Sequence, residues 1–316
     1  MRDFLTEESF EKRMNEELLP LLESVAHEGH FRSTDGKKLH FVRYAALAPR
    51  GTVVILHGYT ESAAKYRELC AYFVRDGLDV LILDQRGHGD SVREGKDGAV
   101  YVKRFEQYTE DLDALLHTVA GDIHKPYYLF GHSMGGGVAA LYLEQHPDVF
   151  AKAILDAPMI EMTHKGISRA GCRFLCGFAK LIGKGKHPIE LLRKPREGGE
   201  RAASYRSAAR AAYYRAFREA HPHYRVGPAS FAWLYTAIDL PRRVLAKGAP
   251  ERVRIPVRLY AAEYDHLVER EPQIEFISRV QNGELVTVKG AEHEIYSAVD
   301  AVSHPFFEGV LDFFAE

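Results

Sequence analysis

The chain has 316 residues, of which 46% are hydrophobic and 27% are charged, and its formal net charge is −2 at pH 7. These are ordinary values for a globular enzyme, and the near-neutral charge gives no reason to expect a nucleic-acid partner. The sequence contains neither an apolar run long enough to cross a bilayer nor the apolar core of a secretory signal, so we expect a cytoplasmic location. Peripheral attachment at the inner membrane face is left as an open alternative.

The first predicted elements are a helix and a hairpin. Apolar side chains recur at helical spacing among charged ones in residues 5–25, which predicts an amphipathic helix that ends near Pro20 or just after it. Residues 37–45 follow a Ser-Thr-Asp-Gly turn and alternate partly between apolar and polar side chains. This alternation predicts an early antiparallel hairpin.

Short apolar runs then alternate with helix-like segments. The apolar runs are residues 52–58, 78–84, 126–131, 151–157 and 257–263, and helical patterns occupy 62–76, 105–120 and 137–145. Residues 284–290 are a plausible last strand. Buried strands that alternate with helices indicate a mostly parallel sheet with helices on both of its faces. With the hairpin included, we expect an α/β fold with about eight strands.

Residues 160–250 break this alternation, because they contain helix-like text and no strong strand pattern. We therefore expect residues 159–251 to form an inserted helical cap, and residues 1–158 and 252–316 to form the α/β core. Residues 161–225 hold 15 Lys and Arg against five acidic residues, a local balance of +10. Such a cap could attract an anionic headgroup or an anionic membrane surface, or its charge could simply be solvated.

The segment Gly131-His132-Ser133-Met134-Gly135 fits the pattern G-x-S-x-G. A strand-like run enters it and a helix-like run leaves it. A sharp strand-to-helix turn exposes a serine hydroxyl above the sheet, and the glycines relieve crowding in the turn. A phosphate loop would require a lysine after its glycines, which is absent here. The sequence therefore predicts Ser133 as a nucleophile, with a glycine-rich turn and a solvated serine as the alternative.

A serine nucleophile needs a base within hydrogen-bond reach and an acid that orients the base. In this arrangement the acid and then the base follow the serine along the chain, each after a strand. His293 follows the last predicted strand and is the candidate base, with His304 as a more distant rival. Asp265 follows the preceding strand and is the candidate acid, with Glu263 and Asp156 as rivals.

Acyl transfer also needs donors for the developing oxyanion, worth on the order of 3 kcal/mol each. The backbone N–H of Met134, directly after the serine, is one candidate, and the N–H of Tyr59, after the strand at 52–58, is the other. A tight strand exit is the alternative explanation of the residues before Tyr59. His88 lies in a glycine-rich loop, where a rigid turn at the edge of the site is favoured over a catalytic role.

The chain has three cysteines, Cys70, Cys172 and Cys176, which is a pattern typical of a reducing compartment. Cys172 and Cys176 lack nearby partner ligands for zinc, so buried apolar cysteines are favoured over a metal site. We expect no metal and no cofactor.

With these residues in order, the chain resembles the α/β-hydrolase superfamily over nearly its full length. The motifs that carry the resemblance are LHGYTESAAKY, GLDVLILDQRGHGDS, GHSMGGGVAALYLEQHP, AEYDHLV and GAEHEI. Within the superfamily it looks like the group of monoacylglycerol lipases and bacterial lysophospholipases, classed with serine-aminopeptidase-like hydrolases. The resemblance implies a triad of Ser133, Asp265 and His293, and an oxyanion hole formed by the amides of Tyr59 and Met134.

We therefore expect a serine hydrolase that cleaves carboxylic esters of small lipid substrates through an acyl-enzyme, as a lysophospholipase or monoacylglycerol lipase would. A short-chain carboxylesterase and a small-peptide aminopeptidase on the same frame are the alternatives. A non-catalytic binding protein should lack a triad member, and all three are present. The sequence does not determine the acyl chain length, the headgroup or the oligomeric state.

Overall fold

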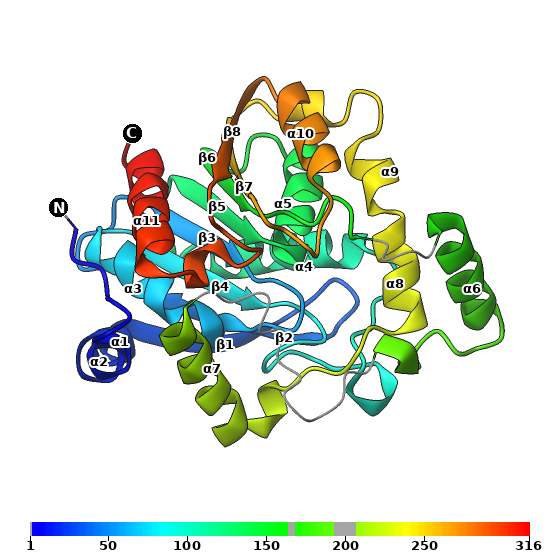
Figure 1. The fold of residues 1–316 in the computed structure, drawn as a ribbon, viewed down its shortest axis with the longest axis horizontal. Helices are drawn as coiled ribbons and strands as arrows, with labels where there is room; N and C mark the ends of the chain where they lie inside the picture. Colours follow the sequence, from blue (N-terminus) through cyan, green and yellow to red (C-terminus); the bar gives the residue numbers. More distant parts are fainter. Residues whose placement is uncertain (1, 164–167, 193–206) are drawn as a thin grey trace.

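The computed structural model describes residues 2–163, 168–192 and 207–316. At its centre lies an eight-stranded sheet with the order β1-β2-β4-β3-β5-β6-β7-β8 (Figure 1). The strands are β1 Ala26–Arg32, β2 Lys38–Tyr44, β3 Thr52–Leu56, β4 Asp79–Asp84, β5 Tyr127–His132, β6 Lys152–Asp156, β7 Pro256–Ala262 and β8 Asn282–Val288. β2 pairs antiparallel with β1 and β4, and every other pairing is parallel. The predicted α/β class and mostly parallel sheet are confirmed.

Helices cover both faces of this sheet, and each face has its own apolar core. The main helices of the two layers are α3 Arg67–Arg75, α4 Glu106–Val119, α5 Met134–Gln145, α10 Arg270–Arg279 and α11 Asp300–Ala315. Alternate residues of β3 point to opposite faces, so Val54 and Leu56 pack with α4 and α5, whereas Val53 and Ile55 pack with α3 and α11. Burial on both faces is why the central strands β3, β4 and β5 are largely apolar, whereas the edge strand β8 is mostly exposed.

The N-terminal helix begins and ends later in the chain than the sequence suggests. It consists of α1 Phe10–Arg13, the π-helical turn η1 Met14–Leu18 and α2 Leu19–Val25. The predicted end near Pro20 is wrong, because Pro20 lies in the first turn of α2 and the helix continues to Val25. A proline lacks its N–H and is tolerated best in a first turn. The wider π-helical turn lies directly before α2, so a new first turn begins at α2 although the helix as a whole continues.

The segment between β6 and β7 is helical in its described parts. It contains α6 Arg169–Leu181, η4 Glu190–Leu192, α7 Ala208–Ala220, η6 Pro222–Tyr224, α8 Phe231–Ile238, α9 Leu240–Val244 and η7 Pro250–Arg252. The other short helices are η2 Ala63–Tyr66, η3 Lys96–Gly98 and η8 Ile295–Ser297. None of the helices within the described ranges is long and apolar enough to cross a membrane.

The helices of this segment lie on two sides of the molecule. α6 packs on α8 and α9 packs on α5, whereas α7 packs on α1 at the opposite side (Figure 1). Arg210 of α7 holds this second position by donating to Glu68 and Asp300. Of the predicted cap, residues 164–167 and 193–206 lie outside the described chain, together with six of its basic residues. The cap boundaries at 159 and 251 stay a prediction.

Glu144 on α5 is a buried acid whose Oε1 has no hydrogen-bond partner among the described residues. Burial raises the pKa of its carboxyl to about 9, although Arg252 and Arg279 oppose this. Because the unfolded chain ionises Glu144 at a much lower pH, its contribution to stability is present in acid and is lost as the pH rises toward 9.

We predict that Glu144→Gln raises the free energy of unfolding by about 1–3 kcal/mol at pH 8 and much less at pH 4.5. The substitution removes the titrating proton and keeps the size of the side chain. Urea unfolding of both proteins at the two pH values measures the difference. An equal gain at both pH values would contradict the proposed cause.

Candidate active site

Ser133 lies at the turn between β5 and α5. Its backbone has φ 51° and ψ −117°, a left-handed conformation that is costly for a residue with a side chain. The turn holds it there: its N–H donates to the carbonyl of Asp156 at 3.0 Å. A side chain at position 135 could not fit, because a Cβ on Gly135 would lie 2.0 Å from the carbonyl oxygen of Leu56. The sequence therefore folds into a tight bend with the serine at its tip.

The structure brings the three predicted triad residues together. His293 Nε2 lies 2.7 Å from Ser133 Oγ, and His293 Nδ1 lies 2.7 Å from Asp265 Oδ2. A carboxylate can only accept, so Nδ1 carries the proton and Nε2 is left to accept from the serine hydroxyl. His293 is 4% exposed, so bulk water hardly competes for these bonds.

Asp265 is held as a carboxylate in this position. Its Oδ1 accepts from the backbone N–H groups of Leu267 and Val268 at 2.9 and 3.1 Å. Burial alone would raise the pKa of Asp265, but the hydrogen bonds from His293 and the two amides outweigh burial and hold it below its ordinary value. Because the ionised Asp265 lies beside His293 Nδ1, it stabilises the imidazolium that forms when His293 Nε2 gains a proton.

The rival residues have other partners. His304 Nε2 lies 2.8 Å from the backbone carbonyl oxygen of Leu5, so this histidine is engaged elsewhere in the fold. Glu263 accepts from the N–H of Gly290 and is exposed. Asp156 lies 2.7 Å from His132 Nδ1 within the core. Asp156 raises the pKa of His132 despite the opposing effect of burial.

His88 is fully buried, and burial lowers the pKa of its imidazole to about 3. Its ring lies against the rings of His57 and Tyr59, with centroids 5.1 and 5.6 Å apart. A neutral, enclosed ring supports the edge of the site, which agrees with the structural role favoured for this loop.

The two predicted oxyanion donors belong to the loop after β3 and to the start of α5. Met134 is the first residue of α5, and the N–H groups of a first helical turn have no acceptor within the helix. The N–H of Tyr59 belongs to the peptide bond that joins Gly58 to Tyr59. The carbonyl of Gly58 lies 2.8 Å from His57 Nδ1, and the N–H at the other end of that trans peptide points the opposite way.

His57 can hold that carbonyl because its tautomer is fixed. The backbone N–H of Gln85 donates to His57 Nε2 at 3.0 Å, so Nε2 is an acceptor and Nδ1 carries the proton. Burial lowers the pKa of His57, which keeps the ring neutral. The sequence interpretation assigned only a tight strand exit to this histidine as an alternative, and missed that it orients the next peptide.

Glu61 is a second group that the sequence interpretation missed. Its Oε2 accepts from the N–H of Gly58 at 2.7 Å and from the hydroxyl of Tyr66 at 2.6 Å. Its Oε1 accepts from Lys65 Nζ at 2.6 Å and from the hydroxyl of Tyr296 at 2.9 Å. The i, i+4 spacing of Glu61 and Lys65 was the only signal in the sequence.

This buried cluster ties the Tyr59 loop to the loop that carries His293. Lys65 Nζ also donates to Glu294, the residue after His293, at 2.7 Å. Burial would raise the pKa of Glu61, but Lys65 and its hydrogen bonds lower it well below the usual range. The carboxylate therefore stays charged, and both loops are fixed to it.

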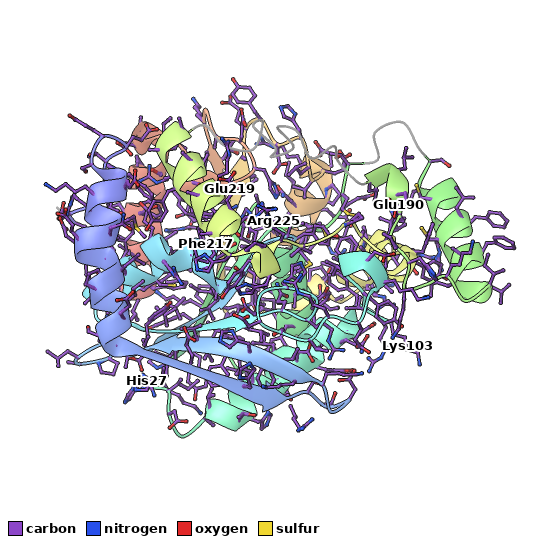
Figure 2. The ribbon with its side chains drawn as sticks, turned by 90° about the horizontal axis from the view of Figure 1, so that it is seen from below. His27, Lys103, Glu190, Phe217, Glu219 and Arg225 are labelled. Carbon is purple, nitrogen blue, oxygen red and sulfur yellow. The ribbon has the colours of Figure 1, made fainter. Side chains whose placement is uncertain are left out.

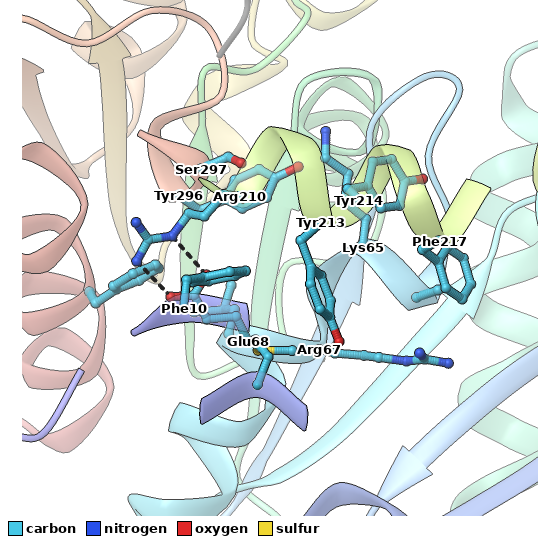
Figure 3. A pocket seen from close by; sticks show the side chains of 14 residues that line it. Phe10, Lys65, Arg67, Glu68, Arg210, Tyr213, Tyr214, Phe217, Tyr296 and Ser297 are labelled. Atoms are coloured by element: carbon cyan, nitrogen blue, oxygen red, sulfur yellow. Dashed lines mark hydrogen bonds and ion pairs between the residues drawn. The ribbon is translucent and has the colours of Figure 1, made fainter. Parts of the chain in front are cut away.

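A small cavity lies behind this cluster, between the N-terminal helix, α3 and α7 (Figure 3). Its volume is about 40 Å³, which is close to that of one water molecule. Figure 3 shows Arg210 joined to Glu68 at one end and Lys65 beside Tyr214 at the other. These cations already have partners, so the cavity supplies no separate binding site.

Among the described residues, one group of side chains has metal-ligand spacing: His40, Asp84 and Asp90, with atoms within 4.8 Å of one another. Asp84 already accepts from the N–H groups of Ala63 and Asp90 at 2.8 and 3.0 Å, and lies 2.8 Å from His40 Nδ1. Its oxygens therefore hold the turn after β4 together. That the protein uses no metal or cofactor stays a prediction.

Comparisons with known proteins identify the family and the relatives of this chain. Residues 48–300 match the family described as serine aminopeptidase, S33. The chain is 31% identical over 311 residues to lysophospholipase L2 of Escherichia coli, covering 91% of this chain and 87% of that protein. It is 36% identical over 137 residues to monoacylglycerol lipase of Mycolicibacterium smegmatis, covering 43% of this chain and 46% of that protein.

The fold also resembles that of solved structures. A soluble variant of monoglyceride lipase from Saccharomyces cerevisiae, in complex with a substrate analog, aligns with a TM-score of 0.71 and 21% identity. The alignment covers 92% of this chain and 94% of that chain. At this identity the likeness concerns the fold alone.

We predict that Glu61→Gln lowers kcat for a soluble p-nitrophenyl ester by about 10- to 100-fold, or 1.4 to 2.8 kcal/mol, with little change in KM. The NH2 group of the glutamine side chain is a donor, so it would face another donor, either Lys65 or the N–H of Gly58. One of the two loops would therefore lose its hydrogen bond to this side chain. Glu68→Gln is the matched control, because Glu68 is a buried, Arg-paired acid nearby that contacts neither loop. It should lower the melting temperature and leave kcat near the wild-type value. Equal losses of kcat in both variants would show that Glu61 acts only through stability.

Proposed function

The chain belongs to the serine aminopeptidase S33 family and has the α/β-hydrolase fold, and on that premise we propose that it hydrolyses carboxylic esters of lipids. The observation that carries the proposal is the continuous hydrogen-bonded chain from Ser133 Oγ through the His293 imidazole to the Asp265 carboxylate. This geometry is what a serine needs to become a nucleophile at neutral pH.

In the proposed first step, Ser133 Oγ attacks the ester carbonyl carbon while its proton moves to His293 Nε2. The carbonyl electrons move to oxygen, and that oxyanion accepts hydrogen bonds from the amides of Tyr59 and Met134. When the intermediate collapses, the bond to the alcohol breaks and His293 gives its proton to the leaving oxygen. The acyl group is then attached to Ser133.

Water completes the cycle by the same route. His293 takes a proton from water as the water oxygen attacks the acyl carbon, and returns the proton to Ser133 Oγ as the fatty acid leaves. Asp265 keeps its charge throughout and stabilises the imidazolium in both steps. Glu61 and His57 touch no reacting atom, so they act as positioning residues for the oxyanion donors.

For the substrate class we propose a lysophospholipid first and a monoacylglycerol second. Two observations support the order: the full-length relative named lysophospholipase L2, and the excess of basic residues between β6 and β7, which suits an anionic headgroup or membrane surface. A short-chain esterase and a small-peptide aminopeptidase use the same triad and would differ only in the substrates they accept.

We predict that the protein releases fatty acid from lysophosphatidylethanolamine and 1-oleoylglycerol, and that Ser133→Ala lowers both rates by a factor on the order of 10⁴ or more. Mass spectrometry of the released acids measures this. Ser303→Ala, at a buried serine of α11, is the matched control and should keep wild-type rates. p-Nitrophenyl acetate and alanine p-nitroanilide complete the panel. Cleavage of only the acetate or only the anilide would replace the lipid proposal by one of its alternatives.

A further inference from the structure

Helix α6 exposes its large apolar side chains. Phe174, Leu175, Phe178 and Leu181 are 73%, 61%, 54% and 83% exposed, and Ile182, directly after the helix, is also exposed. Their spacing of three, four and seven residues places them on one face of the helix. Single exposed apolar residues are ordinary on a protein surface, whereas a continuous apolar face of this size marks an interaction site.

The opposite face of α6 is made of small residues and packs on α8. Cys176 and Ala179 are buried, and a Cβ on Gly177 would lie 3.1 Å from the ring of Tyr235 in α8. Arg173 donates to Asp239 and stacks on Tyr235, and the Lys180 Nζ lies 4.1 Å from the centre of the same ring. The cations therefore lie toward the protein and the large apolar side chains lie toward solvent.

This arrangement inverts the usual amphipathic helix of a globular protein, which buries its large apolar side chains. α6 lies at the outer edge of the molecule, beside α8 and away from the sheet (Figure 1). In Figure 2 the same helix lies at one end of the molecule, and its side chains project outward. It thus forms a convex apolar ridge about 12 Å long, given 1.5 Å per residue. The ridge consists of Phe174, Leu175, Phe178, Leu181 and Ile182.

The charge around the ridge indicates what it contacts. Residues 168–189 contain five cationic side chains, Arg169, Arg173, Lys180, Lys184 and Lys186, and no acidic one. Lys184 and Lys186 follow the ridge directly and are exposed, and Lys186 also pairs with Glu94 at 3.7 Å. Large apolar side chains on one face with basic residues beside them are the pattern of a helix that lies in the plane of a membrane interface. A convex ridge enters a fluid bilayer without needing a matching groove.

We propose that the ridge on α6 docks the protein on anionic phospholipid bilayers, with Phe174, Phe178 and Leu181 inserted at the level of the headgroups and Lys184 facing lipid phosphates. The inference rests on the proposed function in one respect, since it places the enzyme where its lipid substrate is found. The docking surface itself needs no hydrolysis and can be measured without it.

The test uses the full chain carrying Ser133→Ala, so that lipid is not consumed. Co-sedimentation with vesicles of phosphatidylcholine containing 30 mol% phosphatidylglycerol gives the partition coefficient. Combining Phe174→Ser, Phe178→Ser and Leu181→Ser should lower it at least tenfold, because the apolar area that enters the bilayer is lost. Leu47→Ser is the matched control, since Leu47 is fully exposed in a loop elsewhere. Pure phosphatidylcholine vesicles should bind the parent protein more weakly.

A second measurement does not depend on the folding of the triple variant. Leu181→Trp adds a tryptophan to the ridge, whereas the native Trp233 is 3% exposed and supplies a constant background. The fluorescence of the Leu181→Trp variant should be quenched by vesicles that contain brominated phosphatidylcholine, and that of Leu47→Trp should not. Absence of quenching at position 181 would overturn the proposal, as would wild-type partitioning of the triple variant.

Two further outcomes separate this proposal from others. Light scattering that shows a dimer dissociated by the triple substitution, with no vesicle binding by the parent protein, would assign the ridge to a second copy of the chain. With Ser133 restored, the triple variant should cleave a soluble p-nitrophenyl ester at the wild-type rate. If the protein binds vesicles through the ridge but cleaves no lipid, the docking proposal stands and the proposed function fails.

Discussion

The 2.7 Å contact between Ser133 Oγ and His293 Nε2 is the interaction on which the rest of the site depends. It joins the loop after β5 to the loop after β8, and Asp265 after β7 holds the other side of the imidazole. All three loops leave the same edge of the sheet, because the carboxyl ends of parallel strands meet there. The distance is therefore set by the pairing of β5, β6, β7 and β8 and not by any one motif. The left-handed backbone conformation of Ser133 is unfavourable, and the packing of the surrounding elements offsets this cost.

Behind this contact, the charges of the site are buried in pairs. Glu61 and Lys65 have almost no solvent contact, and an unpaired charge in such a place is strongly destabilising. Each is satisfied by several partners, so the cluster resists motion of the loops that it joins. The same reasoning explains Glu144, a buried acid whose Oε1 has no hydrogen-bond partner within the described part of the chain and whose pKa rises instead. The two acids show that burial alone does not decide protonation; the neighbouring donors do.

The sequence predicted the elements whose signal is local. β3 and β5 are continuously apolar because both of their faces are buried, and the strand-to-helix context of Ser133 needs only its neighbours in the chain. Asp265 and His293 were found because each follows a strand of a parallel sheet. Features that depend on distant contacts were missed: the Glu61 cluster, and α7 lying across the molecule from α6. The end of the N-terminal helix was misplaced for a local reason, because Pro20 lies in the first turn of α2. The outward apolar face of α6 was also hidden, because helical spacing shows that a face exists and not which way it points.

Covalent labelling tests the central claim most directly. A fluorophosphonate reacts with a serine only when a base activates it and oxyanion donors receive the phosphonyl oxygen. We expect one adduct per chain, and peptide mapping by mass spectrometry should place it on Ser133. Absence of an adduct on the folded protein, or an adduct on a different serine, would contradict the assignment of Ser133, His293 and Asp265 to the reaction.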